Sequence, residues 1–230
     1  LQGEGFDNLR AICTKNLLEA VIIGEEKVLL GGNCSMKLGK TNKPILAEKA
    51  TGGTLGASTV ISVVCAALTF EGYHAANVTT GVKAKVTREN ADGSKDVYGG
   101  GTAQKSDAAK VTTGAGTTNS VTATVAPTKG AFAYAWFWGT ENAEKLGAIT
   151  TTNNVTITAD AEGTQTAKDL PAADWSANEL VIDGYLTQTI QNGGYFKTLP
   201  TGVGLTADKA AGIAEIDDAF RWFWDNYKAS

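Results

Sequence analysis

Histidine and cysteine are scarce in this chain of 230 residues, which limits the chemistry it can perform. Cys13, Cys34 and Cys65 are widely spaced, no C-x-x-C pair occurs, and His74 is the only histidine. A structural zinc site needs about four such ligands, so no zinc site is expected. We interpret the three cysteines as small buried thiols of a protein kept in a reducing compartment.

The sequence also lacks a long apolar run and an excess of basic residues. No run of about eighteen apolar residues occurs, so no membrane-spanning helix is expected. The net charge of −4 argues against a sequence-specific nucleic-acid binder, which normally carries a basic stripe. A starting methionine and a signal peptide are both missing, and we therefore expect the chain to be part of a longer polypeptide.

Side chains that could carry catalysis do not converge in the sequence. A Ser-His-Asp or Cys-His arrangement would have to use His74, which lies in a polar turn region without a nucleophile motif. Gly39-Lys40-Thr41 resembles the end of a phosphate-binding loop, but Cys34 stands where that loop needs a glycine. Residues 88–99 have only part of a calcium-loop pattern, and a tight turn explains them better. We expect no enzyme activity, no cofactor and no metal site.

The residues that are abundant favour β-structure between two helical sections. The chain has 27 glycines and only 19% charged residues, which is typical of short strands with many turns. Residues 6–30 carry apolar side chains at helical spacing and stop at Gly31-Gly32, so we predict one helix there. Its apolar residues spread widely enough to predict cover on more than one side.

The middle of the chain has the pattern of an antiparallel sandwich. Residues 37–58 are rich in glycine, threonine and lysine and are expected to be a connector. We predict about eight short strands after it, which include segments 59–70, 81–88, 96–100, 119–126, 131–139, 144–150 and 153–159. Asp92-Gly93 predicts a hairpin between the second and third of these segments. Strands this short and evenly separated are typical of a β-sandwich.

Helical patterns return from about residue 168. Ser176 followed by Glu179 predicts a capping box at the start of one helix. Apolar residues at helical spacing predict a second helix over residues 213–227. A β-module between helical sections is what an insertion produces, because insertions are tolerated where two chain ends lie close together.

The flanking helical segments resemble a known family. "LLEAVIIGEEKVLLGGN" (17–33) is similar to the distal part of the spine helix of tailed-phage major capsid proteins of the Hong Kong 97 type. "GIAEIDDAFRWFWDNYKAS" (212–230) resembles a helix of those proteins that ends in Trp-Asp-x-Tyr, and "LVIDGYLTQ" (180–188) resembles their re-entry into the capsid domain. Residues 121–158 resemble the immunoglobulin-like insertion that many such proteins carry.

The resemblance implies an α+β protein in which an immunoglobulin-like antiparallel β-sandwich interrupts part of a capsid domain. Residues 1–42 and 168–230 would be the two parts of the capsid domain, and residues 43–167 the insertion. The family implies a head-shell subunit that forms hexamers and pentamers with its own copies, in the virion and, during assembly, in the host cytoplasm. Scaffold or decoration proteins are further candidate partners. The residues expected to pack in the capsid domain or against neighbouring copies are Leu9, Leu17, Ile213, Ile216, Phe220, Phe223 and Tyr227.

The aromatic stretch "AFAYAWFWG" (131–139) admits two interpretations. Strand alternation places Tyr134, Trp136 and Trp138 on one face, and the stretch resembles the strand that buries a tryptophan in immunoglobulin-like sandwiches. We therefore predict a structural core of Val121, Val125, Tyr134 and Trp136, with Trp138 the ring most exposed to water. The alternative is an aromatic platform on a surface module that holds glycans or host surfaces weakly.

Overall fold

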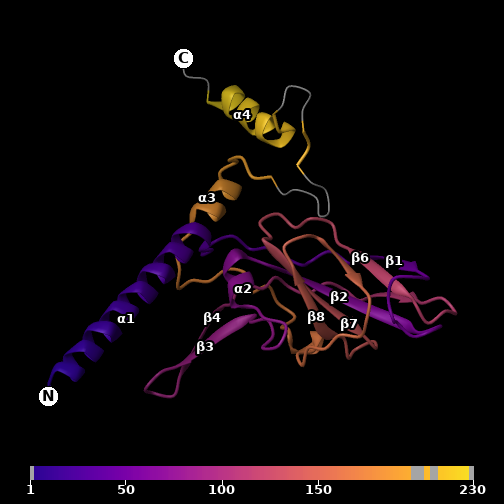
Figure 1. Ribbon diagram of the computed structural model, residues 1–230, viewed down its shortest axis with the longest axis horizontal. Helices are drawn as coiled ribbons and strands as arrows, with labels where there is room; N and C mark the ends of the chain where they lie inside the picture. Colours follow the sequence, from indigo (N-terminus) through magenta and orange to yellow (C-terminus); the bar gives the residue numbers. More distant parts are fainter. Residues whose placement is uncertain (1–2, 198–204, 208–211, 228–230) are drawn as a thin grey trace.

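The protein combines helices with antiparallel sheets (Figure 1). A computed structural model describes residues 3–197, 205–207 and 212–227. Within these residues there are nine strands and four α-helices, with a single 3-10 turn at Ala167–Asp169. The helices are α1 (Gly3–Gly31), α2 (Phe70–Ala75), α3 (Tyr185–Gln191) and α4 (Ala214–Asn226). The order of helix, strands and helices agrees with the sequence pattern.

Seven strands form two antiparallel sheets. The three-stranded sheet has the order β1-β6-β9 and consists of β1 (Ile45–Lys49), β6 (Ser120–Thr124) and β9 (Asn154–Ile157). The four-stranded sheet has the order β5-β2-β7-β8 and consists of β5 (Ala109–Thr112), β2 (Val60–Leu68), β7 (Ala133–Gly139) and β8 (Lys145–Thr150). Neighbours in each sheet are mostly not consecutive in the chain, so most of the pairing is non-local.

The main apolar core lies between these two sheets. Alternate residues of β2 and β7 point to one side and meet inward residues of β6 and β9 in one cluster. All four residues predicted for the core are buried in this cluster: Val121, Val125, Tyr134 and Trp136. Two sheets that enclose a common core are compatible with a β-sandwich.

The four-stranded sheet is covered on its second face as well. Phe137, with alanines from β2 and β7, packs there against Leu146 and Leu170 in a second cluster. The small alanines let the covering segments approach the sheet closely. Phe132 also packs against this cluster and contacts Phe70 of α2 edge to face, with ring centroids 5.1 Å apart. The central strands are therefore buried on both sides.

The two apolar clusters include residues from before and after segment 43–167, the predicted insertion. Leu38 belongs to the main cluster, and the Thr41 hydroxyl accepts a hydrogen bond from the Ala67 N–H at 2.9 Å. Leu170 belongs to the second cluster, and the buried Ser176 hydroxyl accepts from the Leu38 N–H at 2.9 Å. These contacts hold the two flanking segments beside each other at the base of α1.

The third sheet is a two-stranded hairpin formed by β3 (Lys85–Glu89) and β4 (Lys95–Gly99). In Figure 1 this hairpin extends away from the packed sheets toward the lower left. Gly93 has a φ of 81°, which a glycine adopts without strain, and Asp92 Oδ1 accepts from the Ser94 N–H. The predicted hairpin at Asp92-Gly93 is confirmed.

Three local predictions are wrong. No helix begins at Ser176; the Ser176 side chain is buried by tertiary contacts, and α3 begins only at Tyr185. The expected connector 37–58 contains β1, which pairs with β6. The polar turn around His74 is the short helix α2, where the Thr69 hydroxyl accepts from the Gly72 N–H as an N-terminal cap.

Two predictions about burial are also wrong. Trp138 is only 7% exposed, because its ring lies in the main core and its indole Nε1 donates to the Ala159 carbonyl at 2.9 Å. Of the three cysteines only Cys65 is buried, and burial raises the pKa of its thiol. Cys13 is exposed on α1 and Cys34 is half-buried.

Candidate assembly surface

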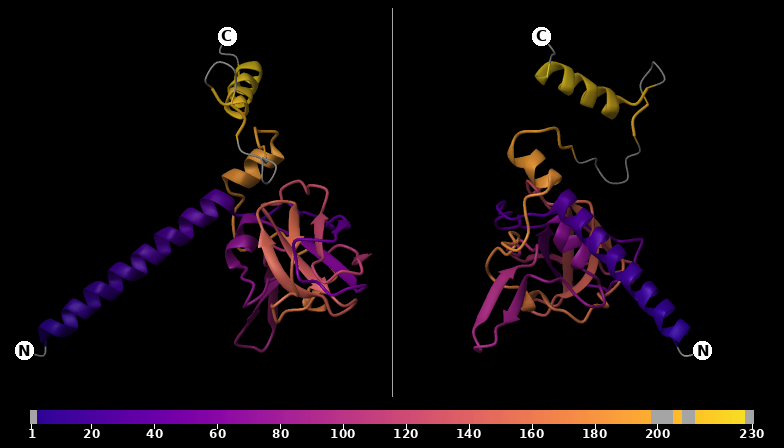
Figure 2. Two further views of the ribbon diagram at one scale, coloured as in Figure 1. Left: turned by 45° about the vertical axis from the view of Figure 1, so that its right-hand side comes forward. Right: turned by 90° about the vertical axis from the view of Figure 1, so that its left-hand side faces the viewer.

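Helix α1 carries an unusual amount of exposed apolar surface. From residue 8 to residue 30 only Val28 is half-buried, and all other side chains are exposed. The predicted helix is confirmed, but the described residues do not form its predicted cover. The reason is visible in Figure 2, where α1 runs outward and only its C-terminal end meets the rest of the protein. We call the following residues the α1 surface: Leu9, Ile12, Leu17, Leu18, Val21, Ile22, Ile23, Leu29 and Leu30.

The α1 surface surrounds the helix. With 3.6 residues per turn, Leu18, Ile22 and Leu29 fall on one side of the helix. Ile12, Ile23 and Leu30 fall on a second side. Leu17, which is 66% exposed, and Val21 fall on a third. Large apolar side chains that occur on every side of a helix normally pack against other structure, and the described residues do not supply that structure here.

The C-terminal end of α1 is fixed to the segment before α3 by hydrogen bonds. The Gly32 carbonyl accepts from the Gly184 N–H at 2.8 Å and from the Thr187 hydroxyl at 2.7 Å. The buried Asn33 side chain donates to the Met36 and Ser176 carbonyls and accepts from the Met36 N–H. The direction in which α1 leaves the protein is therefore set by backbone and side-chain contacts.

Asp183 holds the next residues of the same junction. Its Oδ1 accepts from the Cys34 N–H at 2.7 Å and from the Ser35 N–H at 3.0 Å, and its Oδ2 accepts from the Ser35 hydroxyl at 2.6 Å. Burial alone would raise the pKa of Asp183. The hydrogen bonds from Ser35 and Cys34 together outweigh that effect and lower the pKa below its ordinary value of 3.8. The ionised carboxylate therefore stabilises the junction.

A groove of about 290 Å³ lies between α1 and α2 at this end. It is lined mainly by apolar atoms, including those of Val28 and Phe70, with Glu71 and His74 also at its wall. Glu71 Oε1 accepts from Asn178 Nδ2 at 2.7 Å, whereas its buried Oε2 has no hydrogen-bond partner in the described residues. Burial raises the pKa of Glu71, and the hydrogen bond from Asn178 opposes the rise. The groove therefore adds apolar surface at the C-terminal end of α1.

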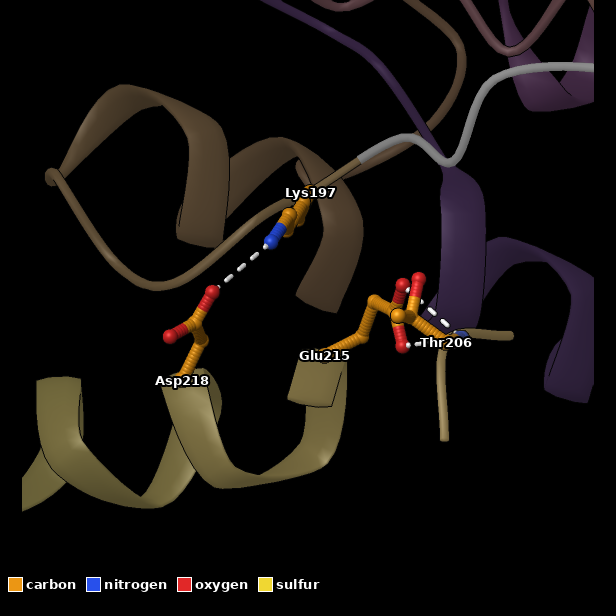
Figure 3. Close-up of polar contacts among 4 residues, drawn as sticks. All are labelled: Lys197, Thr206, Glu215 and Asp218. Carbon is orange, nitrogen blue, oxygen red and sulfur yellow. Dashed lines mark hydrogen bonds and ion pairs between the residues drawn. The ribbon is translucent and has the colours of Figure 1, made fainter. Parts of the chain in front are cut away.

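Helix α4 is held by a few contacts with nearby segments (Figure 3). Lys197 Nζ lies 3.3 Å from Asp218 Oδ2, and the Thr206 N–H donates to the Glu215 carboxylate at 3.0 Å and 3.2 Å. Trp222 packs against Tyr195 with ring centroids 5.6 Å apart. The ion pair is exposed, and exposed pairs contribute little to stability. Tyr195 also contacts Phe223, so its ring supplies apolar contacts that hold α4 to this segment.

The outer side of α4 is a second exposed apolar patch. Ile216, Phe220, Phe223, Trp224 and Tyr227 are all exposed, and Phe220 is 69% exposed. We call these five residues the α4 surface. The predicted helix over 213–227 is confirmed as α4, with Ile213 at its N-terminal cap and Tyr227 at its C-terminal cap.

The residues predicted for assembly are thus exposed or half-buried within the single chain. Leu9 and Leu17 lie on α1, and Ile216, Phe220, Phe223 and Tyr227 lie on the α4 surface, while Ile213 is half-buried beside it. The structure places the two groups on separate helices. Sequence reasoning missed the junction residues Asp183 and Gly184, because their partners lie about 150 positions away and no periodic pattern marks them.

The stretch 131–139 does not form an exposed aromatic platform. Tyr134, Trp136 and Trp138 are all buried, and Trp136 Nε1 donates to the Thr150 hydroxyl at 2.8 Å. A hydrogen-bonded indole inside a closed core explains these rings without a ligand.

The described part of the chain shows no group of three or more metal-ligating side chains. In the same residues, no helix combines the length and apolar character that crossing a membrane requires.

The chain therefore combines α-helices with antiparallel β-sheets, and the apolar side chains of helix α1 are exposed. A scan against models of protein families found no match to this chain, and comparisons with curated proteins and with solved structures found none either.

Proposed function

We propose that this chain is a structural assembly subunit, part of the head shell of a tailed bacteriophage of the Hong Kong 97 type. In this proposal α1 and α4 belong to the capsid domain and pack against neighbouring copies. The sheets between them form the immunoglobulin-like insertion that decorates the shell. The similarity of segments 17–33, 180–188 and 212–230 to capsid segments supports this assignment.

The observation that carries the proposal is the α1 surface. Large apolar side chains exposed on all sides of a helix mark an association surface. Burying the exposed half of these nine side chains is worth on the order of 10 kcal/mol in total. Association itself costs about 4–15 kcal/mol in lost freedom. One pairwise contact is therefore marginal, whereas several contacts per subunit, as a shell provides, give a stable assembly.

Sedimentation velocity over a range of protein concentrations tests the proposal. We expect the wild-type chain to self-associate. The variant Leu18→Glu, Ile22→Glu and Leu29→Glu should associate much more weakly than the wild type, because it charges one whole side of α1 while keeping good helix formers. A matched control places the same three charges on exposed threonines outside the helices, Thr80→Glu, Thr87→Glu and Thr117→Glu.

The control should associate like the wild type. The proposal fails if the wild-type chain is a monomer at every concentration, or if the α1 variant associates as strongly as the threonine control. Circular dichroism of each variant shows whether the sheets remain folded.

A further inference from the structure

A second site lies away from the assembly surface, at one end of the packed sheets. A cleft of about 660 Å³ lies between two parts of the chain. On one side are the loop before β7 and the β8–β9 turn, and on the other is the segment that follows α3. This volume falls within the range of natural small-molecule sites. The described residues that line it are Pro127, Thr128, Lys129, Gly130, Ala131, Tyr134, Thr151, Thr152, Asn153, Ile190, Gly193, Gly194 and Phe196.

One wall of the cleft carries hydroxyl and amide groups. They belong to Thr128 in the loop before β7 and to Thr151, Thr152 and Asn153 in the β8–β9 turn. Asn153 Nδ2 donates to the Val125 carbonyl at 2.7 Å, which ties this turn to the chain that leaves β6. The polar groups are therefore held in place by the sheets before any ligand binds.

Thr128 ties the loop before β7 to the core. Its N–H donates to the Tyr134 hydroxyl at 3.0 Å, and its Oγ1 is buried. Burial raises the pKa of Tyr134, and hydrogen bonding from the backbone and the side chain of Thr128 opposes that rise. The contact with Tyr134 therefore fixes this wall of the cleft before any ligand binds.

The opposite wall is apolar and comes from a different part of the chain. Ile190 at the end of α3 is buried, and Phe196 is 39% exposed. Among the described residues that line the cleft, Lys129 is the only charged one, and it is exposed. The site therefore offers hydrogen bonds on one side, an aromatic ring on the other, and little charge.

We propose that this cleft binds a neutral saccharide. A sugar ring has an apolar C–H face that suits Phe196 and a rim of hydroxyls that suits the threonine and asparagine wall. A phosphate or carboxylate ligand would need more than one exposed lysine to offset its desolvation. This inference does not rest on the proposed assembly function, since none of the lining residues belongs to the α1 or α4 surface.

Chemical-shift mapping by NMR on the full chain tests this site. The probes are glucose, galactose, N-acetylglucosamine, cellobiose and lactose, each titrated into the millimolar range, with inorganic phosphate as an anionic comparison. We expect at least one sugar to shift the amide signals of residues 127–131, 151–153 and 190–196, and phosphate to shift them less.

Two variants separate binding from folding. Phe196→Ala should weaken sugar binding about tenfold, whereas Phe220→Ala, which removes an exposed ring outside the cleft, should leave it unchanged. Thr151→Val, at an exposed threonine of the polar wall, should weaken binding about threefold and leave the melting temperature unchanged.

Four results would overturn the inference: no shift with any of the five sugars, shifts that map elsewhere, a stronger response to phosphate than to every sugar, or full affinity in Phe196→Ala.

Discussion

Trp136 shows how one residue can hold the two sheets together. Its side chain is completely buried between them, and its indole N–H is paired with Thr150. We expect Trp136→Ala to lower the free energy of unfolding by about 3–5 kcal/mol, because it removes a large buried ring and leaves a cavity. Trp224→Ala is the matched control: that ring is 73% exposed, and its loss should change stability by less than about 0.5 kcal/mol.

Denaturant unfolding followed by far-ultraviolet circular dichroism measures both variants. Equal stability of Trp136→Ala and wild type would contradict the core position of this ring.

Asp183 is the residue whose charge matters most at the base of α1. Its folded pKa lies below the ordinary value of 3.8, so its stabilising effect is complete above that value and is lost as the pH falls through the folded pKa. At neutral pH we expect Asp183→Ala to destabilise the protein by about 1 kcal/mol, discounted because water can replace part of the lost bonding.

The stability difference between Asp183→Ala and wild type should shrink when thermal unfolding is measured below the ordinary pKa. A difference that stays constant from neutral to strongly acidic pH would show that the carboxylate charge has no part in it.

At the residue scale, the sequence was informative where a local pattern decided burial. Alternation along 131–139 correctly placed Tyr134 and Trp136 in the core. The same pattern could not show that Trp138, near the end of its strand, is covered by the chain around Ala159. That cover depends on a non-local contact.

At the scale of elements, Gly184 controls how α3 meets α1. A Cβ at this position would lie 2.6 Å from the Val28 carbonyl oxygen and 2.8 Å from the Gly32 nitrogen, so the backbones would have to separate. We expect Gly184→Ala to lower stability by about 1–3 kcal/mol through overpacking. Gly24→Ala is the control, because nothing lies within 4 Å of a Cβ there and alanine favours the helix.

Thermal unfolding of the two glycine variants is the measurement. Gly24→Ala should be neutral or slightly stabilising, and a similar result for Gly184→Ala would argue against the close approach of the two helices.

Elements with strong periodicity were predictable, and elements defined by partners were not. The β-branched run at 60–68 predicts the strand β2, and Asp92-Gly93 predicts the turn between β3 and β4. The strand Ile45–Lys49 is short and mostly exposed, so only its pairing with β6 makes it a strand. Ser176 and Glu179 have the spacing of a capping box, but no helix starts there. The Ser176 hydroxyl instead accepts a hydrogen bond from the Leu38 N–H.

At the scale of the whole molecule, the sheets and helix α1 differ in how far their apolar side chains are buried. The sheets bury their apolar residues on both faces of the central strands, whereas α1 leaves nearly all of its apolar side chains exposed. A helix of this kind has little stability by itself, because most helical stability in proteins comes from packing of an apolar face. We therefore predict that other copies of the chain stabilise α1.

Hydrogen–deuterium exchange measured at increasing protein concentration tests this claim most directly. Amides of residues 8–30 should exchange rapidly in dilute solution and become protected as copies associate, while amides of β7 stay protected throughout. Rapid exchange of the α1 amides at every concentration would contradict the assembly role of this helix.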